Sequence, residues 1–109
     1  MGNWDVYVDH PSHYNIPGRK ECIEEMKEKY GAEITIIFCL TNAYKYLYRA
    51  GLKEGNPLEQ DINKAKKYYE FSEKLIESSY NSDPQIYPAL KKIFYLRKDI
   101  KDMLDKEDE

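Results

Sequence analysis

The chain has 109 residues, of which 34% are charged and 14% are aromatic, and its formal net charge is −3. This length suits a single domain over residues 1–109 with a modest hydrophobic core, and the acidic balance argues against a general nucleic-acid-binding protein. No apolar run reaches membrane-spanning length and the N-terminus lacks a signal-peptide pattern, so we expect a soluble, cytoplasmic protein with no membrane partner.

Residues 1–18 are predicted to form an irregular N-terminal arm. Apolar and polar side chains alternate over residues 4–8, which also fits a short strand, but a lone strand in a helical chain is marginal without a pairing partner. Residues 10–18 contain two prolines and a glycine, which favour turns over helix.

Two helices are predicted next. The first runs from about Arg19 to Tyr30 and is ended by Gly31, and the second begins between residues 33 and 35 and ends at Gly51. The β-branched stretch at residues 34–37 would equally suit a strand. The apolar positions expected to face the core are Cys22, Ile23, Met26 and Tyr30 on the first helix, and Ile37, Leu40, Tyr44 and Leu47 on the second.

The third helix has a clear start. Asn56 is expected to be its N-cap, with Pro57 at the first helical position and Glu59 completing a capping box. Residues 81–84 interrupt the pattern, and the C-terminal helix, within residues 84–106, is expected to start at Pro88 because proline deep inside a helix removes a hydrogen bond. Regular apolar seams follow both helices: Leu58, Ile62, Ala65, Tyr69, Ser72 and Ile76 on the third, and Ala89, Ile93, Leu96, Ile100 and Met103 on the last.

These elements predict an all-α fold, a small antiparallel bundle of about four helices with an irregular N-terminal arm. The two seams are more regular than one small core requires, which favours a homo-oligomer. The alternative is that both seams are buried within the monomer.

One column of polar side chains marks the second helix. Asn42, Lys45 and Arg49 follow a helical rhythm beside the apolar stripe, and this column contains no acid. Two cations and an amide suit an anion, most plausibly a phosphate. The alternative is a solvated face, or cations paired with acids of another helix.

A second column, on the third helix, consists of Asp61, Lys64 and Tyr68. The short loop between the helices makes them antiparallel neighbours, with Arg49 and Asp61 both near that loop. We therefore expect an ion pair between these two residues, which either only orders the bundle or also orients Arg49 toward a ligand while Lys64 adds a phosphate contact.

The histidines offer little for a metal. His10 and His13 stand in one turn with Tyr14, but no further ligand has convincing spacing, so no metal site is predicted. Instead, His13 and Tyr14 are expected to fold over the second helix and contact a phosphate or a base; the alternative is an arm that packs only for stability. Cys22 and Cys39 also lack metal or redox spacing, and buried, reduced thiols are expected.

Four stretches carry a family resemblance: HPSHY at residues 10–14, ECIE at 21–24, FCLTNAYKYLYRAG at 38–51 and NPLEQDINKAKKYY at 56–69. Together they resemble a family of small phage proteins classed as a domain of unknown function and as SaV-like, over roughly residues 9–76. The family core would then be the helices of residues 19–80, and the setting would be the host cell cytoplasm.

The resemblance also bears on the site. Asn42, Lys45 and Arg49 match the N, K and R of the family's N-A-x-K-Y-x-x-R, and Asp61 and Lys64 match its D-L-x-K. His13 and Tyr14 are motif positions too, whereas His10 stands where the family often has asparagine. Two departures concern packing, since Lys67 replaces a tryptophan and Tyr69 a leucine.

Three functions follow as hypotheses. The first is a nucleotide-binding protein that holds a nucleotide or a nucleotide-derived signal. Sequestration of a host defence signal is one use of such binding. The ligand-binding residues would be His13, Tyr14, Asn42, Lys45, Arg49, Asp61 and Lys64. The second comes from the resemblance, which includes phage nucleotide kinases without a P-loop and would require ATP and Mg²⁺. The third is a module that binds a host factor.

Overall fold

The computed structural model describes residues 21–52, 55 and 57–107. The predicted N-terminal arm with its strand at residues 4–8 lies outside the described residues, as do His10, His13, Tyr14 and Asn56. Within the described ranges the chain forms five α-helices and no strand. They are α2 (Cys22–Tyr30), α3 (Ala32–Arg49), α4 (Leu58–Ser79), α5 (Ile86–Lys92) and α6 (Phe94–Glu107). The prediction of an all-α fold is confirmed.

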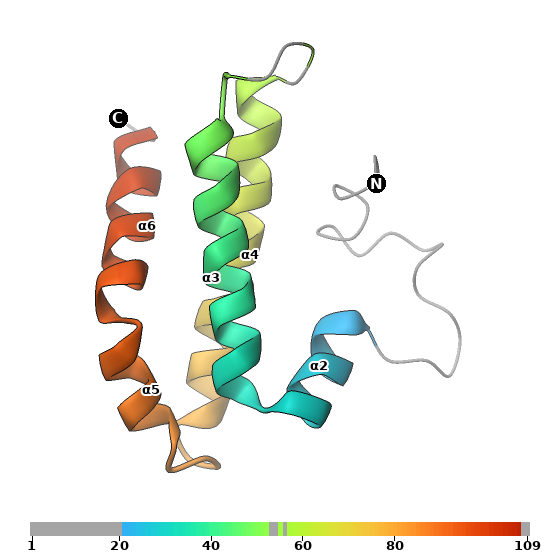
Figure 1. The fold of residues 1–109 in the computed structure, drawn as a ribbon, viewed down its shortest axis with the longest axis vertical. Helices are drawn as coiled ribbons and strands as arrows, with labels where there is room; N and C mark the ends of the chain where they lie inside the picture. Colours follow the sequence, from blue (N-terminus) through green and yellow to red (C-terminus); the bar gives the residue numbers. More distant parts are fainter. Residues whose placement is uncertain (1–20, 53–54, 56, 108–109) are drawn as a thin grey trace.

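Helix α3 is the centre of the arrangement, since it contacts each of the other four helices. Helices α3 and α4 lie side by side and run in opposite directions, and α5 and α6 follow one another along the opposite flank of α3 (Figure 1). The short α2 packs near the N-terminal end of α3 (Figure 1). Helix α3, helix α4 and the segment formed by α5 and α6 therefore alternate in direction, as an antiparallel bundle requires.

The core is built mainly by one face of α3. Its buried side chains pack against buried residues of α4, including Ile62, Ala65 and Ile76, and of the C-terminal helices, including Ile93 and Ile100. Most of both predicted seams is consumed inside the monomer in this way. The buried apolar residues of α3 are Ala32, Ile36, Cys39, Leu40, Ala43, Tyr46 and Leu47.

The predicted apolar stripe of α3 is partly wrong. Leu40 and Leu47 are buried, but Ile37 is only partly buried and Tyr44 is 42% exposed. Because α4 and α6 pack on two sides of α3, the buried surface is broad and is centred on Ile36 and Ala43 instead. The seam of α4 likewise begins at Ile62, because Leu58 at the helix start is 49% exposed.

Gly31 ends α2, as predicted, and α3 begins at the next residue, Ala32, just before the predicted range of 33–35. The φ of Gly31 is 92°, a conformation that favours glycine, and its backbone N–H donates to the Lys27 carbonyl oxygen. The Thr35 hydroxyl donates to the Gly31 carbonyl at 2.9 Å, which joins the first turn of α3 to this corner. The β-branched stretch at residues 34–37 is thus helical, and the strand alternative is wrong.

Helix α2 buries less than its pattern predicted. None of its residues is fully buried, and Cys22 and Tyr30 are exposed, so the expectation of a buried Cys22 thiol is wrong. A nine-residue helix that packs mainly against one neighbour can cover only a narrow strip of its surface. Cys39, in contrast, is fully buried as expected.

The predicted starts of the last helices also need correction. Pro57 is the N-cap of α4 rather than its first helical residue, with an extended ψ of 139°, and among the described residues no side chain caps this helix. The C-terminal segment begins at Ile86, two residues before Pro88. Backbone N–H groups in the first turn of a helix have no acceptor within that helix, so a proline there removes no helical hydrogen bond. The segment is also divided at Ile93, and the change of direction there keeps both α5 and α6 on the core.

Candidate functional site

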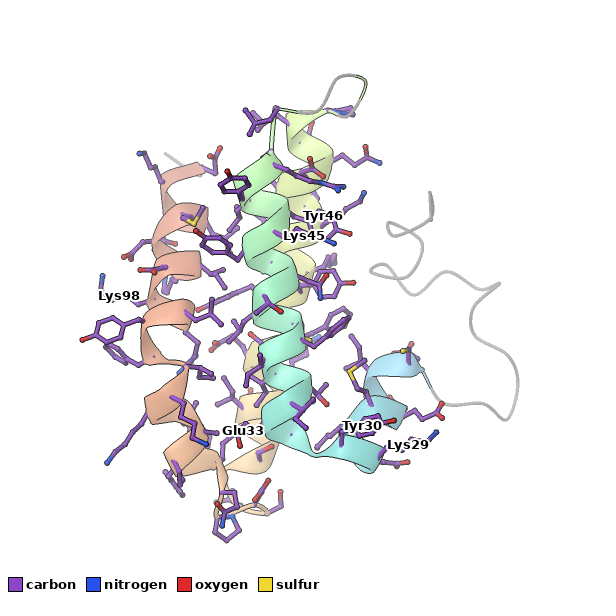
Figure 2. All side chains as sticks on the ribbon, in the orientation of Figure 1. Lys29, Tyr30, Glu33, Lys45, Tyr46 and Lys98 are labelled. Atoms are coloured by element: carbon purple, nitrogen blue, oxygen red, sulfur yellow. The ribbon has the colours of Figure 1, made fainter. Side chains whose placement is uncertain are left out.

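Three cationic side chains gather around one tyrosine ring between α3 and α4. The distances from the centre of the Tyr46 ring are 4.5 Å to Lys45 Nζ, 4.8 Å to Arg49 Cζ and 5.3 Å to Lys64 Nζ. Figure 2 shows Lys45 and Tyr46 on the side of α3 away from α6. We call Lys45, Arg49 and Lys64, with Tyr46 and the nearby carboxylate of Asp61, the cationic cluster.

The cluster joins two elements of the sequence analysis. Lys45 and Arg49 come from the first predicted column, and Asp61 and Lys64 from the second. The antiparallel packing of α3 and α4 places the last turn of one helix beside the first turn of the other, so residues 12 to 19 positions apart in sequence meet in space. The prediction that these two helices are antiparallel neighbours, with Arg49 and Asp61 near the loop between them, is therefore confirmed.

The predicted ion pair between Arg49 and Asp61 is present. Both Nε and Nη2 of Arg49 donate to Oδ1 of Asp61 at 3.4 Å. The Asp61 side chain is fully buried, whereas that of Arg49 remains 33% exposed. The carboxylate thus holds the buried edge of the guanidinium and leaves its outer edge available to a ligand.

The ring of Tyr46 is the buried group that all three cations of the cluster approach. Tyr46 is fully buried, and its ring stacks on that of Tyr68 with centroids 5.9 Å apart and an interplanar angle of 13°. Phe38 and Phe71 each pack an edge against Tyr68, at 5.9 Å and 6.4 Å. This aromatic packing fixes the ring that the three cations approach, and the negative face of such a ring attracts cations.

The charges of the cluster do not balance within its own five residues. Three cations face one carboxylate, and the pKa of Lys45 is lowered, first by partial burial and then by the charges of Arg49 and Lys64, with Asp61 opposing. Lys64 is 8% exposed, so one of these cations is itself largely removed from water. An added anion would therefore relieve repulsion among the three cations.

The remaining predicted ligand residues stand as follows. Asn42 is partly buried, and its side-chain amide donates to the Phe38 carbonyl oxygen of its own helix at 2.8 Å, which leaves its oxygen as the group to face a ligand. His13 and Tyr14 lie outside the described residues, so their place over α3 stays a prediction. In the described ranges, no three His, Cys, Asp or Glu side chains are grouped in a way that could hold a metal ion.

The sequence analysis missed the role of Tyr46. Tyr46 stands three positions before Arg49, a spacing that places both side chains on one face of the helix, and it directly follows Lys45 in the sequence. The missed signal is this tyrosine at the border between the polar column and the core. Tyr68, which was placed with Asp61 and Lys64, does share their buried face, and its ring supports that of Tyr46.

Comparison with known proteins gives one match. The model of a family described as a protein of unknown function, DUF3310, matches residues 8–70, which is more than half of the chain. This segment contains α2, α3, the first part of α4 and the whole cationic cluster, whereas α5 and α6 lie beyond it. Searches of curated proteins and of solved structures gave no match.

Separately, no helix in the described part of the chain combines the length and apolar character needed to cross a membrane.

Proposed function

The chain belongs to the DUF3310 family, and we propose that it binds a small phosphorylated ligand, a nucleotide or a nucleotide-derived signal, at the cationic cluster. One observation carries the proposal: three cations from two helices converge on one buried tyrosine ring, with a single carboxylate among them. A phosphate group carries the negative charge and the acceptor oxygens that lysine and arginine side chains bind.

Each residue has a role in this proposal. Lys45 and the outer edge of Arg49 contact phosphate, and Lys64 adds positive charge from α4. Asp61 orients Arg49 through their ion pair, and the Asn42 side-chain oxygen accepts from the ligand. His13 and Tyr14, from the segment before α2, are proposed to cover the base or the sugar.

The wider setting rests on the resemblance to small phage proteins. In this setting the protein acts in the cytoplasm of an infected cell, where holding a nucleotide-derived signal would withdraw it from host defence. The kinase alternative would need Asp61 to assist Mg²⁺ or the acceptor, and it has less support because this carboxylate is fully buried against Arg49. That environment suits orientation of a guanidinium better than coordination of a metal.

The proposal is tested by isothermal titration calorimetry at low salt with inorganic phosphate, AMP, ATP and cyclic AMP. The informative variant is Lys45→Met, because this exposed side chain can be neutralised without uncovering a buried charge. Its matched control is Lys91→Met, which removes an exposed lysine of α5. Loss of one charge-assisted hydrogen bond should weaken binding by Lys45→Met at least about tenfold, while the control binds as the unmodified chain does.

Equal affinity of Lys45→Met and the unmodified chain for every compound would remove the cluster as the binding site. Parallel incubation of nucleoside monophosphates with ATP and Mg²⁺ distinguishes the alternatives. Formation of ADP and a nucleoside diphosphate selects the kinase, binding without turnover selects the binding protein, and neither result leaves the host-factor module.

We also propose that the protein forms a homo-oligomer. The basis is the exposed face of α3 and not the apolar seams of the later helices, which are mostly buried within the monomer. The outward face of α3 carries Ile34, Tyr44 and Tyr48, which are 55%, 42% and 70% exposed and follow heptad spacing. A second copy packed on this face would cover these three side chains.

Light scattering at increasing protein concentration checks this association. Tyr48→Glu places a charge on the exposed face and should give a smaller average mass than the unmodified chain at the same concentration. Tyr95→Glu on α6, where the tyrosine is 74% exposed, is the control. A mass equal to one chain at every concentration contradicts the oligomer.

A further inference from the structure

Lys45 differs in its surroundings from three other exposed lysines among the described residues. Lys29, Lys98 and Lys101 each form an ion pair with a carboxylate one helical turn away, at 2.8–2.9 Å, and the pKa of each is raised by that carboxylate. Among the described residues, Lys45 has no carboxylate at ion-pair distance, and the charges of Arg49 and Lys64 both lower its pKa.

The groups that face Lys45 come from α3 and α4. Partial burial lowers the pKa of Lys45 most, the charges of Arg49 and Lys64 lower it further, and Asp61 acts in the opposite direction. A lysine beside other cations keeps a larger fraction of its amine unprotonated, and the unprotonated amine is the nucleophile. Its side chain is exposed, so reagents in solution can reach it.

The geometry adds an anion site within reach of this amine. Lys45 Nζ, Arg49 Cζ and Lys64 Nζ all lie within 5.3 Å of the centre of the same ring. A compound whose phosphate lies against Arg49 and Lys64 is therefore held next to the Lys45 amine. Such positioning raises the effective concentration of any reactive group that the compound carries.

We propose that Lys45 is a modification site that forms a Schiff base with small phosphorylated aldehydes, whose phosphate is held by Arg49 and Lys64. The inference rests on the proposed anion binding and adds a covalent step. The amine lone pair of Lys45 attacks the carbonyl carbon and forms a C–N bond, while one amine proton passes through water to the carbonyl oxygen and gives a carbinolamine. The nitrogen then loses its second proton, the C–O bond breaks and the hydroxyl leaves as water, so that a C=N bond remains with no change in oxidation state.

The test uses the full chain with pyridoxal 5′-phosphate, and pyridoxal as the same aldehyde without phosphate. Borohydride supplies hydride to the C=N bond and fixes the product as a secondary amine, and peptide mass spectrometry locates it. Lys45 should be labelled by the phosphorylated aldehyde on the order of tenfold faster than Lys91, since local positive charge concentrates anionic reagents. Inorganic phosphate should slow this labelling, and pyridoxal should label Lys45 more slowly than its phosphate does.

The pH profile is a second readout. Labelling of Lys45 should reach its plateau at lower pH than labelling of Lys98, because the pKa of Lys45 is lowered and that of Lys98 is raised. A purely structural lysine would show no such difference. Lys45→Arg removes the nucleophile, so it should give no label at position 45, while Lys91 of the same variant is labelled as in the unmodified chain.

The outcomes separate this inference from the proposed function. If Lys45 is labelled no faster than Lys91 while phosphate binding persists, the Schiff-base inference alone is overturned. If phosphate binding is absent and pyridoxal labels Lys45 as fast as its phosphate does, the anion site fails, and the inference fails with it.

Discussion

Replacement of Arg49 by methionine is the perturbation that best tests how the cationic cluster is held together. Arg49 is the residue through which α3 reaches the buried carboxylate of Asp61 on α4. Methionine keeps much of the length and the apolar stem of the side chain but removes the charge and both donors. The variant therefore leaves Asp61 in the core without the cation that faces it at 3.4 Å.

The magnitude follows from burial and distance. Two unit charges 3.4 Å apart attract each other by about 5 kcal/mol at an effective dielectric constant of about 20. Part of this gain is offset by the cost of removing both groups from water, and Arg49 retains 33% exposure. Asp61 also keeps its attraction to Lys45. We therefore expect Arg49→Met to lower the free energy of unfolding by about 2–3 kcal/mol, below the 3–5 kcal/mol typical of a fully buried pair.

Urea unfolding at neutral pH, followed by circular dichroism, measures this loss. Lys45→Met is the matched variant on the same helix face, and it should change the free energy of unfolding by less than about 0.5 kcal/mol, since Lys45 is exposed and faces like charges. In Arg49→Met combined with Asp61→Asn, the loss should be smaller than the sum of the single losses. A loss for Arg49→Met no larger than that for Lys45→Met would refute the reasoning, because the ion pair would then contribute nothing to the packing of α3 on α4.

The two cysteines supply the remaining predictions. In the folded protein a thiol reagent should modify Cys22 rapidly and leave Cys39 unmodified, because Cys22 is exposed whereas Cys39 is buried. Cys22→Ala identifies the reactive thiol. Equal rates of modification of the two cysteines before unfolding would contradict this difference. Burial also raises the pKa of Cys39 from 9.0 to about 12, so between these values the unfolded chain binds fewer protons than the folded one, and stability falls as the pH rises. This thiol alone contributes a slope of up to about 1.4 kcal/mol per pH unit. Urea unfolding between pH 9 and 10.5 should show a shallower slope for Cys39→Ala than for Cys22→Ala, and identical slopes would contradict the assignment.

The sequence predicts the stop of α2 at Gly31 better than it predicts the orientation of α3. Gly31 has a conformation that suits glycine, so its position as a helix stop is determined locally. The orientation of α3 is not determined in this way, because apolar or amphipathic side chains occur on several sides of it, including Tyr44 and Tyr48. Only the packing of α4 and α6 decides which of them are buried. The same is true of Ile93, where neither proline nor glycine announces the division between α5 and α6.

The charged column and the ion pair of the site were predictable from residue spacing, whereas the burial of its charged side chains was not. The column of Lys45 and Arg49 and the pairing of Arg49 with Asp61 follow from helical period and a short loop. The burial of Asp61 and Lys64 does not, because a charged column normally faces water unless a partner compensates the charge.

This burial has a consequence for every functional test of the cluster. Arg49 and Asp61 hold α3 against α4 and also define the anion site, so loss of binding after a change at either residue cannot be separated from loss of packing. Lys45 lies on the same ring but is exposed and has no carboxylate partner among the described residues. Its replacement can abolish binding while the fold persists, so the behaviour of Lys45→Met decides whether the cluster binds a ligand or only joins two helices.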